Sequence, residues 1–202
     1  SVNQIVNLVV EVFVGLTSGA SVIVAQFYGA KDKKNLNKTL HTSYAFGIVT
    51  GFVVAVVGLL VTNTVLELMK TPQELMADSR LYLHIYFCGM IFNIIYNMGA
   101  SILRAVGDSR RPLYVLMVTC GLNIVLDILL VVIFRLGVMG VAIATVSCQG
   151  ISSILVTAML MKEHPLFQLK LREIRFYRVS LNSVLRIGIP AALEATMYTI
   201  AN

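Results

Sequence analysis

The sequence predicts an all-α membrane protein, a polytopic bundle of helices that each cross a bilayer. Of its 202 residues, 57% are hydrophobic and only 13% are charged, whereas soluble domains carry roughly 25% charged residues. The apolar residues form long uninterrupted runs and not the alternating pattern of membrane β-strands. Since backbone groups in lipid must be satisfied within the protein, such runs are expected to cross as helices.

Five apolar runs are long enough to cross a bilayer, and a sixth begins near residue 183. Each complete run has at least the ~20 residues that span the hydrocarbon core of a membrane. The predicted spans are residues 4–28, 40–63, 80–103, 113–134 and 137–161. Because the chain opens and closes inside apolar runs, we expect it to be a piece of a longer protein.

The basic residues predict the orientation of the bundle. Thirteen of the 16 Lys and Arg residues fall in the segments 29–39, 104–112 and 162–186, which share one side if every span crosses once. The positive-inside rule places that side in the cytoplasm. The first span then runs inward, and an odd number of helices, most simply one, is expected before Ser1. The dispersal of these charges over three loops argues against a nucleic-acid partner.

The segment 162–182 is predicted to be a cytoplasmic linker that lies on the membrane surface. It mixes basic and apolar residues after a helix-breaking His-Pro pair, as interfacial segments do. A connector of this length indicates a boundary between two helix bundles. Gly188-Ile-Pro190 is expected to kink or soften the helix that follows.

Small residues predict where helices approach closely. Gly15 and Gly19 are four residues apart on the first span, as are Gly47 and Gly51 on the second, and such pairs let helix backbones touch. The three cysteines, all within apolar runs and without metal-ligand spacing, are expected to be free, small, buried residues. They are Cys88, Cys120 and Cys148.

Motifs of enzymatic chemistry do not occur in the sequence. It has no Walker lysine motif, no Gly-x-Ser-x-Gly and no His-Glu-x-x-His. We therefore predict no catalytic residues, no enzyme activity and no cofactor.

Three carboxylates lie within the spans, at Glu11, Asp127 and Glu194. A charge at the bilayer centre costs about 2.5–3.5 kcal/mol on insertion scales, so such residues face a protein interior or water and are functional candidates. No Lys or Arg lies deep in a span to pair with them, and each is expected to titrate or bind a cation. Glu194 lies near the cytoplasmic end of its helix, where water can solvate it.

Asp127 has the most polar predicted neighbourhood. Asn123 lies one turn earlier on the same helix face. The hairpin after Asp127 is centred near Leu136, so Thr145 should match Asp127 in depth, on the order of 10 Å below the external surface, and Gln149 should match Asn123. Asn, Thr and Gln alone could simply bond neighbouring helices together, but the carboxylate favours a functional patch.

Two further polar stripes are possible linings of a cavity. Asn7 and Glu11 lie one turn apart in the outer half of the first span, although exposure to water at the helix end explains them nearly as well. Asn97 forms a polar face of the third span with Asn93 and Ser101, for which structural hydrogen bonding is the simpler explanation.

Four stretches resemble the multidrug and toxic compound extrusion (MATE) family. They are similar to its second helix and following loop, the loop after its fourth helix, its sixth helix and the start of its seventh. The stretches are Gly15-Leu-Thr-Ser-Gly to Lys-Asp32, Ile102-Leu-Arg-Ala-Val-Gly to Arg-Pro112, Gly137-Val-Met-Gly to Ser147, and Ile187-Gly-Ile-Pro190. The resemblance implies twelve helices in two lobes. Residues 1–161 would hold helices two to six, residues 162–182 the interlobe linker, and residues 183–202 the start of helix seven.

The resemblance also implies a cation site. Some prokaryotic members use an Asp on helix one, an Asn and an Asp one turn apart on helix five, and a Thr on helix six. Asn123, Asp127 and Thr145 match the last three, and the helix-one Asp falls outside this sequence. Other members use a Glu on helix seven about two turns past the Pro. That position falls near Tyr198 here, and Glu194 comes a turn too early.

We therefore predict a secondary active antiporter in the plasma (inner) membrane of a bacterium, which exports drugs or organic cations in exchange for H⁺ or Na⁺. Asp127, Asn123 and Thr145 would couple the ion, with Na⁺ at Asp127 the only metal considered. Gln149, Glu11, Asn7 and Asn97 would line the cavity. The expected partners are small organic cations, the lipid bilayer and the rest of the protein's own chain.

Two alternatives remain open. A lipid-linked oligosaccharide flippase shares the architecture, but it should place Arg or Lys in its cavity. A non-transporting membrane receptor or scaffold would not need an intramembrane cluster of Asp, Asn and Thr.

Overall fold

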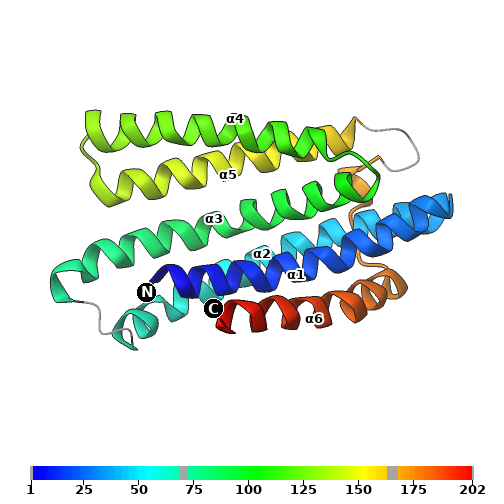
Figure 1. Ribbon diagram of the computed structural model, residues 1–202, viewed down its shortest axis with the longest axis horizontal. Helices are drawn as coiled ribbons and strands as arrows, with labels where there is room; N and C mark the ends of the chain where they lie inside the picture. The colour runs from blue at the N-terminus through cyan, green and yellow to red at the C-terminus, as the bar shows by residue number, and fades with distance from the viewer. Residues whose placement is uncertain (1, 69–71, 163–167, 202) are drawn as a thin grey trace.

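The computed structural model is a bundle of long helices that run alongside one another (Figure 1). It describes residues 2–68, 72–162 and 168–201; within these ranges the side chains of residues 2–14, 16, 68, 195, 196 and 198–201 are not described. The helices are α1 (Val2–Gly29), α2 (Lys33–Leu68), α3 (Gln73–Ala105), α4 (Arg110–Asp127), the π-helix η1 (Ile128–Ile133), α5 (Gly137–Met161), the short η2 (Leu171–Glu173) and α6 (Arg178–Ala201).

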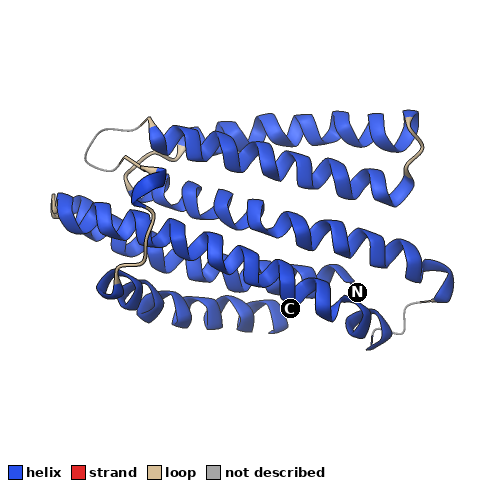
Figure 2. Ribbon diagram, turned by 180° about the vertical axis from the view of Figure 1, so that it is seen from behind, coloured by secondary structure: helices blue, strands red, loops and turns tan. Residues whose placement is uncertain are grey.

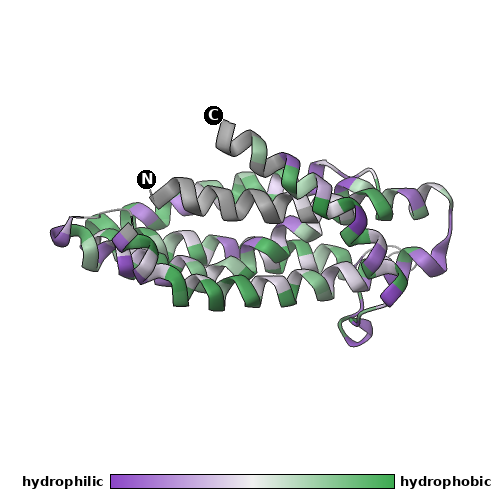
Figure 3. Cartoon of the chain, turned by 90° about the horizontal axis from the view of Figure 1, so that it is seen from below, coloured by the Kyte–Doolittle hydropathy of each residue, from purple (hydrophilic) through white to green (hydrophobic). Residues whose placement is uncertain are grey.

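The all-α class predicted from the sequence is confirmed. The described residues form helices and connecting loops without a strand (Figure 2). Four helical stretches among them are long and apolar enough to cross a membrane: Lys33–Glu67, Gln73–Ala105, Arg110–Ile133 and Gly137–Met161. Figure 3 shows the hydrophobic residues spread along the length of the bundle, which is the arrangement that a lipid environment requires.

The connections between helices alternate between the two ends of the bundle (Figure 1). The helices α1, α3 and α5 finish at one end of the bundle, and α2 and the α4–η1 stretch finish at the other. The three basic segments of the sequence therefore gather at a single end, as the prediction of orientation requires.

The core lies where α3 runs through the middle of the bundle, packed against α1, α2 and α5. At the basic end, Val24, Leu40 and Ile102 belong to one buried apolar cluster. Toward the other end, Leu66 and Met90 belong to a second one. The helix α4 packs mainly on α5, and much of its apolar surface is exposed in the structure.

Glycines mark the places where helix backbones touch. A Cβ atom added to Gly15 would meet the backbone of Ala192, and one added to Gly19 would meet the backbone of Gly188. The first predicted small-residue pair therefore packs α1 directly on α6. On α2, a Cβ at Gly51 would lie 2.9 Å from the Cα of Ile91 on α3.

The winding of the chain changes at Asp127. The α-helical hydrogen bonding of α4 ends at this residue, and the following six residues form η1. There the Phe134 N–H donates to the Leu129 carbonyl at 3.0 Å, a bond over five residues and not four. Apolar periodicity did not predict this change, since the residues of η1 are all aliphatic and fit either winding. Wide turns of this type occur frequently at functional sites.

Part of the predicted linker packs against the helices. Leu169 is only 1% exposed and belongs to the same buried cluster as Leu40 and Leu160. Its N–H donates to the Leu160 carbonyl at 3.0 Å. Leu171 and Phe176 remain exposed, so the position of this segment on the membrane surface stays a prediction. The predicted His-Pro break, at residues 164–165, lies outside the described residues.

The last helix also differs in extent from the predicted span. It begins at Arg178, before the expected start near residue 183, and it continues through Pro190. Proline removes one backbone donor from a helix, so Pro190 leaves a carbonyl one turn earlier without its usual helical partner.

Candidate polar site between α3, α4 and α5

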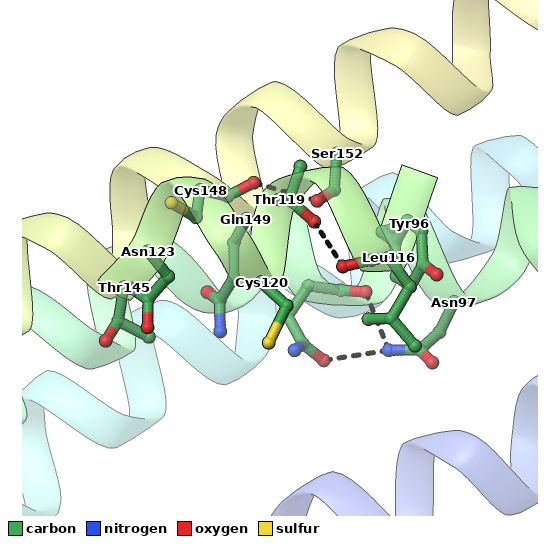
Figure 4. A pocket seen from close by; sticks show the side chains of 11 residues that line it. Tyr96, Asn97, Leu116, Thr119, Cys120, Asn123, Thr145, Cys148, Gln149 and Ser152 are labelled. Carbon is green, nitrogen blue, oxygen red and sulfur yellow. Dashed lines mark hydrogen bonds between the residues drawn. The ribbon is translucent and has the colours of Figure 1, made fainter. Parts of the chain in front are cut away.

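A pocket of about 400 Å³ lies between α3, α4 and α5 (Figure 4). Most of its lining residues carry a hydroxyl, amide or thiol group. They are Asn93, Tyr96 and Asn97 from α3, Leu116, Thr119, Cys120 and Asn123 from α4, and Thr145, Cys148, Gln149 and Ser152 from α5. Among these lining residues none carries a formal charge.

Four residues selected from the sequence line this pocket: Asn97, Asn123, Thr145 and Gln149. The hairpin argument therefore brought Asn123, Thr145 and Gln149 together correctly. Asp127 lies one helical turn beyond Asn123 and is not among the lining residues.

Of the remaining candidates, Asn7 and Glu11 have side chains that fall outside the described part of the structure. Glu194 is exposed on α6.

Several lining groups are satisfied by their own helix. The amide of Asn97 donates to both the carbonyl and the side-chain oxygen of Asn93, each at 2.9 Å. The hydroxyl of Thr145 donates to the Val141 carbonyl at 3.0 Å, and that of Thr119 to the Val115 carbonyl at 2.9 Å. These bonds agree with a structural role for Asn97, and they leave the Thr145 oxygen able to accept a further bond.

Three other polar atoms at this site are buried and have no hydrogen-bond partner among the described residues. They are the Nδ2 of Asn123, which has only the weakly accepting thiol of Cys148 beside it, the Oδ1 of Asp127 and the Oε1 of Gln149. A buried polar atom without a partner costs about 1–3 kcal/mol, and folded proteins contain few of them. Three such atoms, one donor and two acceptors, on facing parts of α4 and α5 favour a site built to bind something polar.

Asp127 interacts with aromatic and thiol groups and not with bases. Tyr82 on α3 and Cys148 on α5 are close enough to interact with it electrostatically, and Tyr82 stacks on Tyr86 with ring centroids 5.9 Å apart. In the part of the chain that the structure describes, no Lys or Arg forms an ion pair with Asp127. A carboxylate without a counter-ion is suited to accept a proton or a cation.

Other lining residues were missed by the sequence reasoning. Thr119 and Cys120 lie four and three residues before Asn123, so helical spacing alone could have placed them on the same face. The cysteines were all expected to be buried, but only Cys148 is; Cys88 and Cys120 are exposed, and all three are free. Apolar context predicts membrane insertion and does not distinguish an outer face from a buried one.

The comparisons with known proteins define the class as a multi-pass transporter fold of the plasma membrane. The family model MatE matches residues 1–129, and the chain belongs to this family. It is 33% identical over 201 residues to the probable multidrug resistance protein YoeA of Bacillus subtilis, covering 96% of this chain and 43% of that protein. It is 31% identical over 199 residues to the probable multidrug resistance protein YpnP of the same organism, covering 98% and 44%.

Solved structures give the same result. A MATE structure in the bent conformation superposes with a TM-score of 0.91 at 26% identity, covering 98% of this chain and 44% of that one. The outward-facing conformation of a MATE family transporter gives a TM-score of 0.90 at 25% identity, covering 99% and 45%. The chain thus spans less than half the length of the relatives it matches.

Proposed function

We propose that this chain supplies the first lobe of a secondary active transporter, not an enzyme, which exports drugs or organic cations in exchange for H⁺ or Na⁺. The observation that carries the proposal is the group of unpartnered buried atoms on Asn123, Asp127 and Gln149 beside the pocket. Relatives of this chain are named for multidrug resistance or export, among them the multidrug export protein MepA of Staphylococcus aureus, which is 26% identical over 179 residues.

The coupling ion would act at Asp127. Its carboxylate, the amide of Asn123 and the hydroxyl of Thr145 offer oxygen ligands of the kind that Na⁺ takes, and the same carboxylate can accept H⁺. Either ion neutralises a charge that is costly to hold in a membrane without a partner. Binding of the ion would thereby change the relative free energies of two conformations and drive alternating access.

The neighbouring pocket would hold part of the exported molecule. Its uncharged polar lining suits an organic cation, which needs polar contacts but no opposing Lys or Arg. The absence of basic side chains from the described lining does not favour the alternative of a flippase for anionic lipid carriers. We assign the remainder of the protein, including helix one and the second lobe, to completing the cavity.

The first prediction tests the coupling role of Asp127 in the full-length protein. Replacement of Asp127 by Asn keeps the shape of the side chain but removes its charge, so ion-driven dye efflux should fall by at least tenfold. The measurement is dye efflux from proteoliposomes under an imposed pH gradient without Na⁺, and under a Na⁺ gradient at constant pH. The gradient that drives efflux by the wild type identifies the coupling ion.

A matched control is Asp78→Asn, which removes an exposed carboxylate on α3 far from the pocket lining. This variant should transport as the wild type does. Wild-type efflux by Asp127→Asn under both gradients would overturn the assignment of the coupling site to Asp127.

A further inference from the structure

Three neighbouring side chains of α2 connect the first lobe to the linker. Thr39, His41 and Thr42 are all fully buried, each 0% exposed. The hydroxyl of Thr42 accepts from the Tyr177 N–H at 3.1 Å and donates to the Arg175 carbonyl at 3.4 Å. The hydroxyl of Thr39 donates to that of Ser180 on α6 at 3.4 Å.

The partners of His41 define its protonation state in the structure. Its Nδ1 lies 2.8 Å from the Asn37 carbonyl, and its Nε2 lies 3.0 Å from the backbone nitrogen of Lys170 in the linker. A carbonyl can only accept and a backbone N–H can only donate, so Nδ1 must carry a proton and Nε2 must not. The geometry therefore requires a neutral imidazole in one tautomer.

The charged groups around this end of α2 do not offer a replacement partner. Of the acids that the structure describes here, Asp32 accepts from Asn35 at 2.6 Å, and Glu173 pairs with Lys170 at 3.2 Å. The described bases of the surrounding elements are Lys31 before α2, Lys33, Lys34 and Lys38 on α2, Arg104 on α3, Lys162 after α5, Lys170, Arg172 and Arg175 in the linker, and Arg178 and Arg186 on α6. A protonated His41 would thus carry its positive charge among mostly positive neighbours.

We propose that His41 is a proton-sensitive latch that holds the interlobe linker against the first lobe. In the neutral form Nε2 accepts the Lys170 N–H. In the protonated form both ring nitrogens are donors, so Nε2 and the Lys170 N–H face each other as two donors and the bond is lost. The latch is closed while the imidazole is neutral and opens when it gains a proton.

The latch is a regulatory device distinct from ion coupling at Asp127. The linker joins α5 to α6, and its fixation by His41 and Thr42 ties the start of α6 to α2. Acidification on the basic-loop side of the membrane would release that tie and loosen the connection between the lobes. The inference rests on hydrogen bonds at the linker and holds whether or not Asp127 couples transport.

The test is hydrogen–deuterium exchange of the full-length protein in lipid nanodiscs at pH 8 and pH 5.5, corrected for the intrinsic effect of pH on exchange. In the wild type, protection of linker residues 168–177 should fall by about tenfold at the lower pH, the effect of losing one hydrogen bond. His41→Gln supplies an acceptor and a donor without titrating, so its linker should stay protected at both values. Thr42→Val removes a partner that does not titrate, so protection should be lower at both values by a similar factor.

Either of two results would overturn the latch. One is linker protection in the wild type that does not change with pH. The other is a pH-dependent loss in His41→Gln equal to that of the wild type. If His41→Gln does not fold, the ¹⁵N shifts of the wild-type imidazole at pH 8 decide: the latch requires the Nδ1–H tautomer, and the Nε2–H tautomer or a charged ring would exclude it.

Discussion

Asn123 and Gln149 face one pocket from two helices, and each holds a buried atom that the described chain leaves without a partner. Stability alone does not account for such residues, because apolar side chains of similar size would fill the same space without the cost. At the scale of single residues, buried polar atoms without a hydrogen-bond partner therefore mark the site.

The second prediction follows from this cost. Asn123→Leu and Gln149→Leu should leave the free energy of unfolding unchanged or raise it by about 1 kcal/mol, because each removes an unpaired polar atom. The same variants should lose about tenfold in apparent affinity for the exported dye, the equivalent of one hydrogen bond to a ligand. Thermal unfolding in detergent and concentration-dependent efflux measure the two effects.

Asn97→Leu is the matched control for stability. The amide of Asn97 donates to Asn93, so its loss should lower the free energy of unfolding by about 1–2 kcal/mol. A comparable loss in Asn123→Leu and Gln149→Leu would show that these residues are structural.

The sequence was informative about most residues of the site but not about the position of Asp127. Helical spacing and the hairpin count placed Asn123, Thr145 and Gln149 on one pocket. The same count assumed α-helical winding up to the turn, whereas the chain after Asp127 is a π-helix. The wider winding alters the depth that the count gives to Asp127, and Asp127 lies one α-helical turn beyond Asn123, outside the pocket lining.

At the scale of helices, the contact of α1 with α6 is made by backbone and not by side chains. Gly15 and Gly19 admit the backbone of Ala192 and Gly188 so closely that no Cβ atom fits. The spacing of these glycines was visible in the sequence. The identity of the facing helix was not, because a small-residue pair carries no information about its partner.

The third prediction compares two glycines. Gly19→Ala should lower the free energy of unfolding by about 1–3 kcal/mol, because the added methyl group must separate α1 from α6. Gly121→Ala on α4 has no heavy atom within 4 Å of the new Cβ, so it should be neutral or stabilising by up to about 1 kcal/mol. Equilibrium unfolding in mixed micelles gives both values, and equal effects would rule out the close contact at Gly19.

At the scale of the whole molecule, the basic loops lie together at one end of the bundle (Figure 1). Charge counting predicted this arrangement because it needs only the order of spans and loops. Docking of the linker was not predictable in the same way: basic and apolar residues are mixed in a lipid-facing segment and in a packed one alike. Only the hydrogen-bond acceptors and the apolar contacts that α2 and α5 supply to the linker distinguish a packed segment from a lipid-facing one.

The fourth prediction concerns orientation. In a full-length variant without its native cysteines, Lys33→Cys at the basic end should react with a membrane-impermeant maleimide only after the cells are permeabilised. Gln73→Cys at the opposite end should react in intact cells. Both residues are exposed in the structure. The reverse labelling pattern would show that the basic end faces the outside of the cell.

The contact between α1 and α6 also has a consequence for the order of events on the ribosome. The two residues that meet in this contact, Gly15 and Ala192, lie near opposite ends of the chain. At ~5–20 residues per second, synthesis of the intervening chain takes roughly ten to thirty-five seconds. During that interval the glycine face of α1 has no permanent partner, and lipid or the insertion machinery must cover it. The helix α1 therefore reaches its final packing only once translation has passed α6.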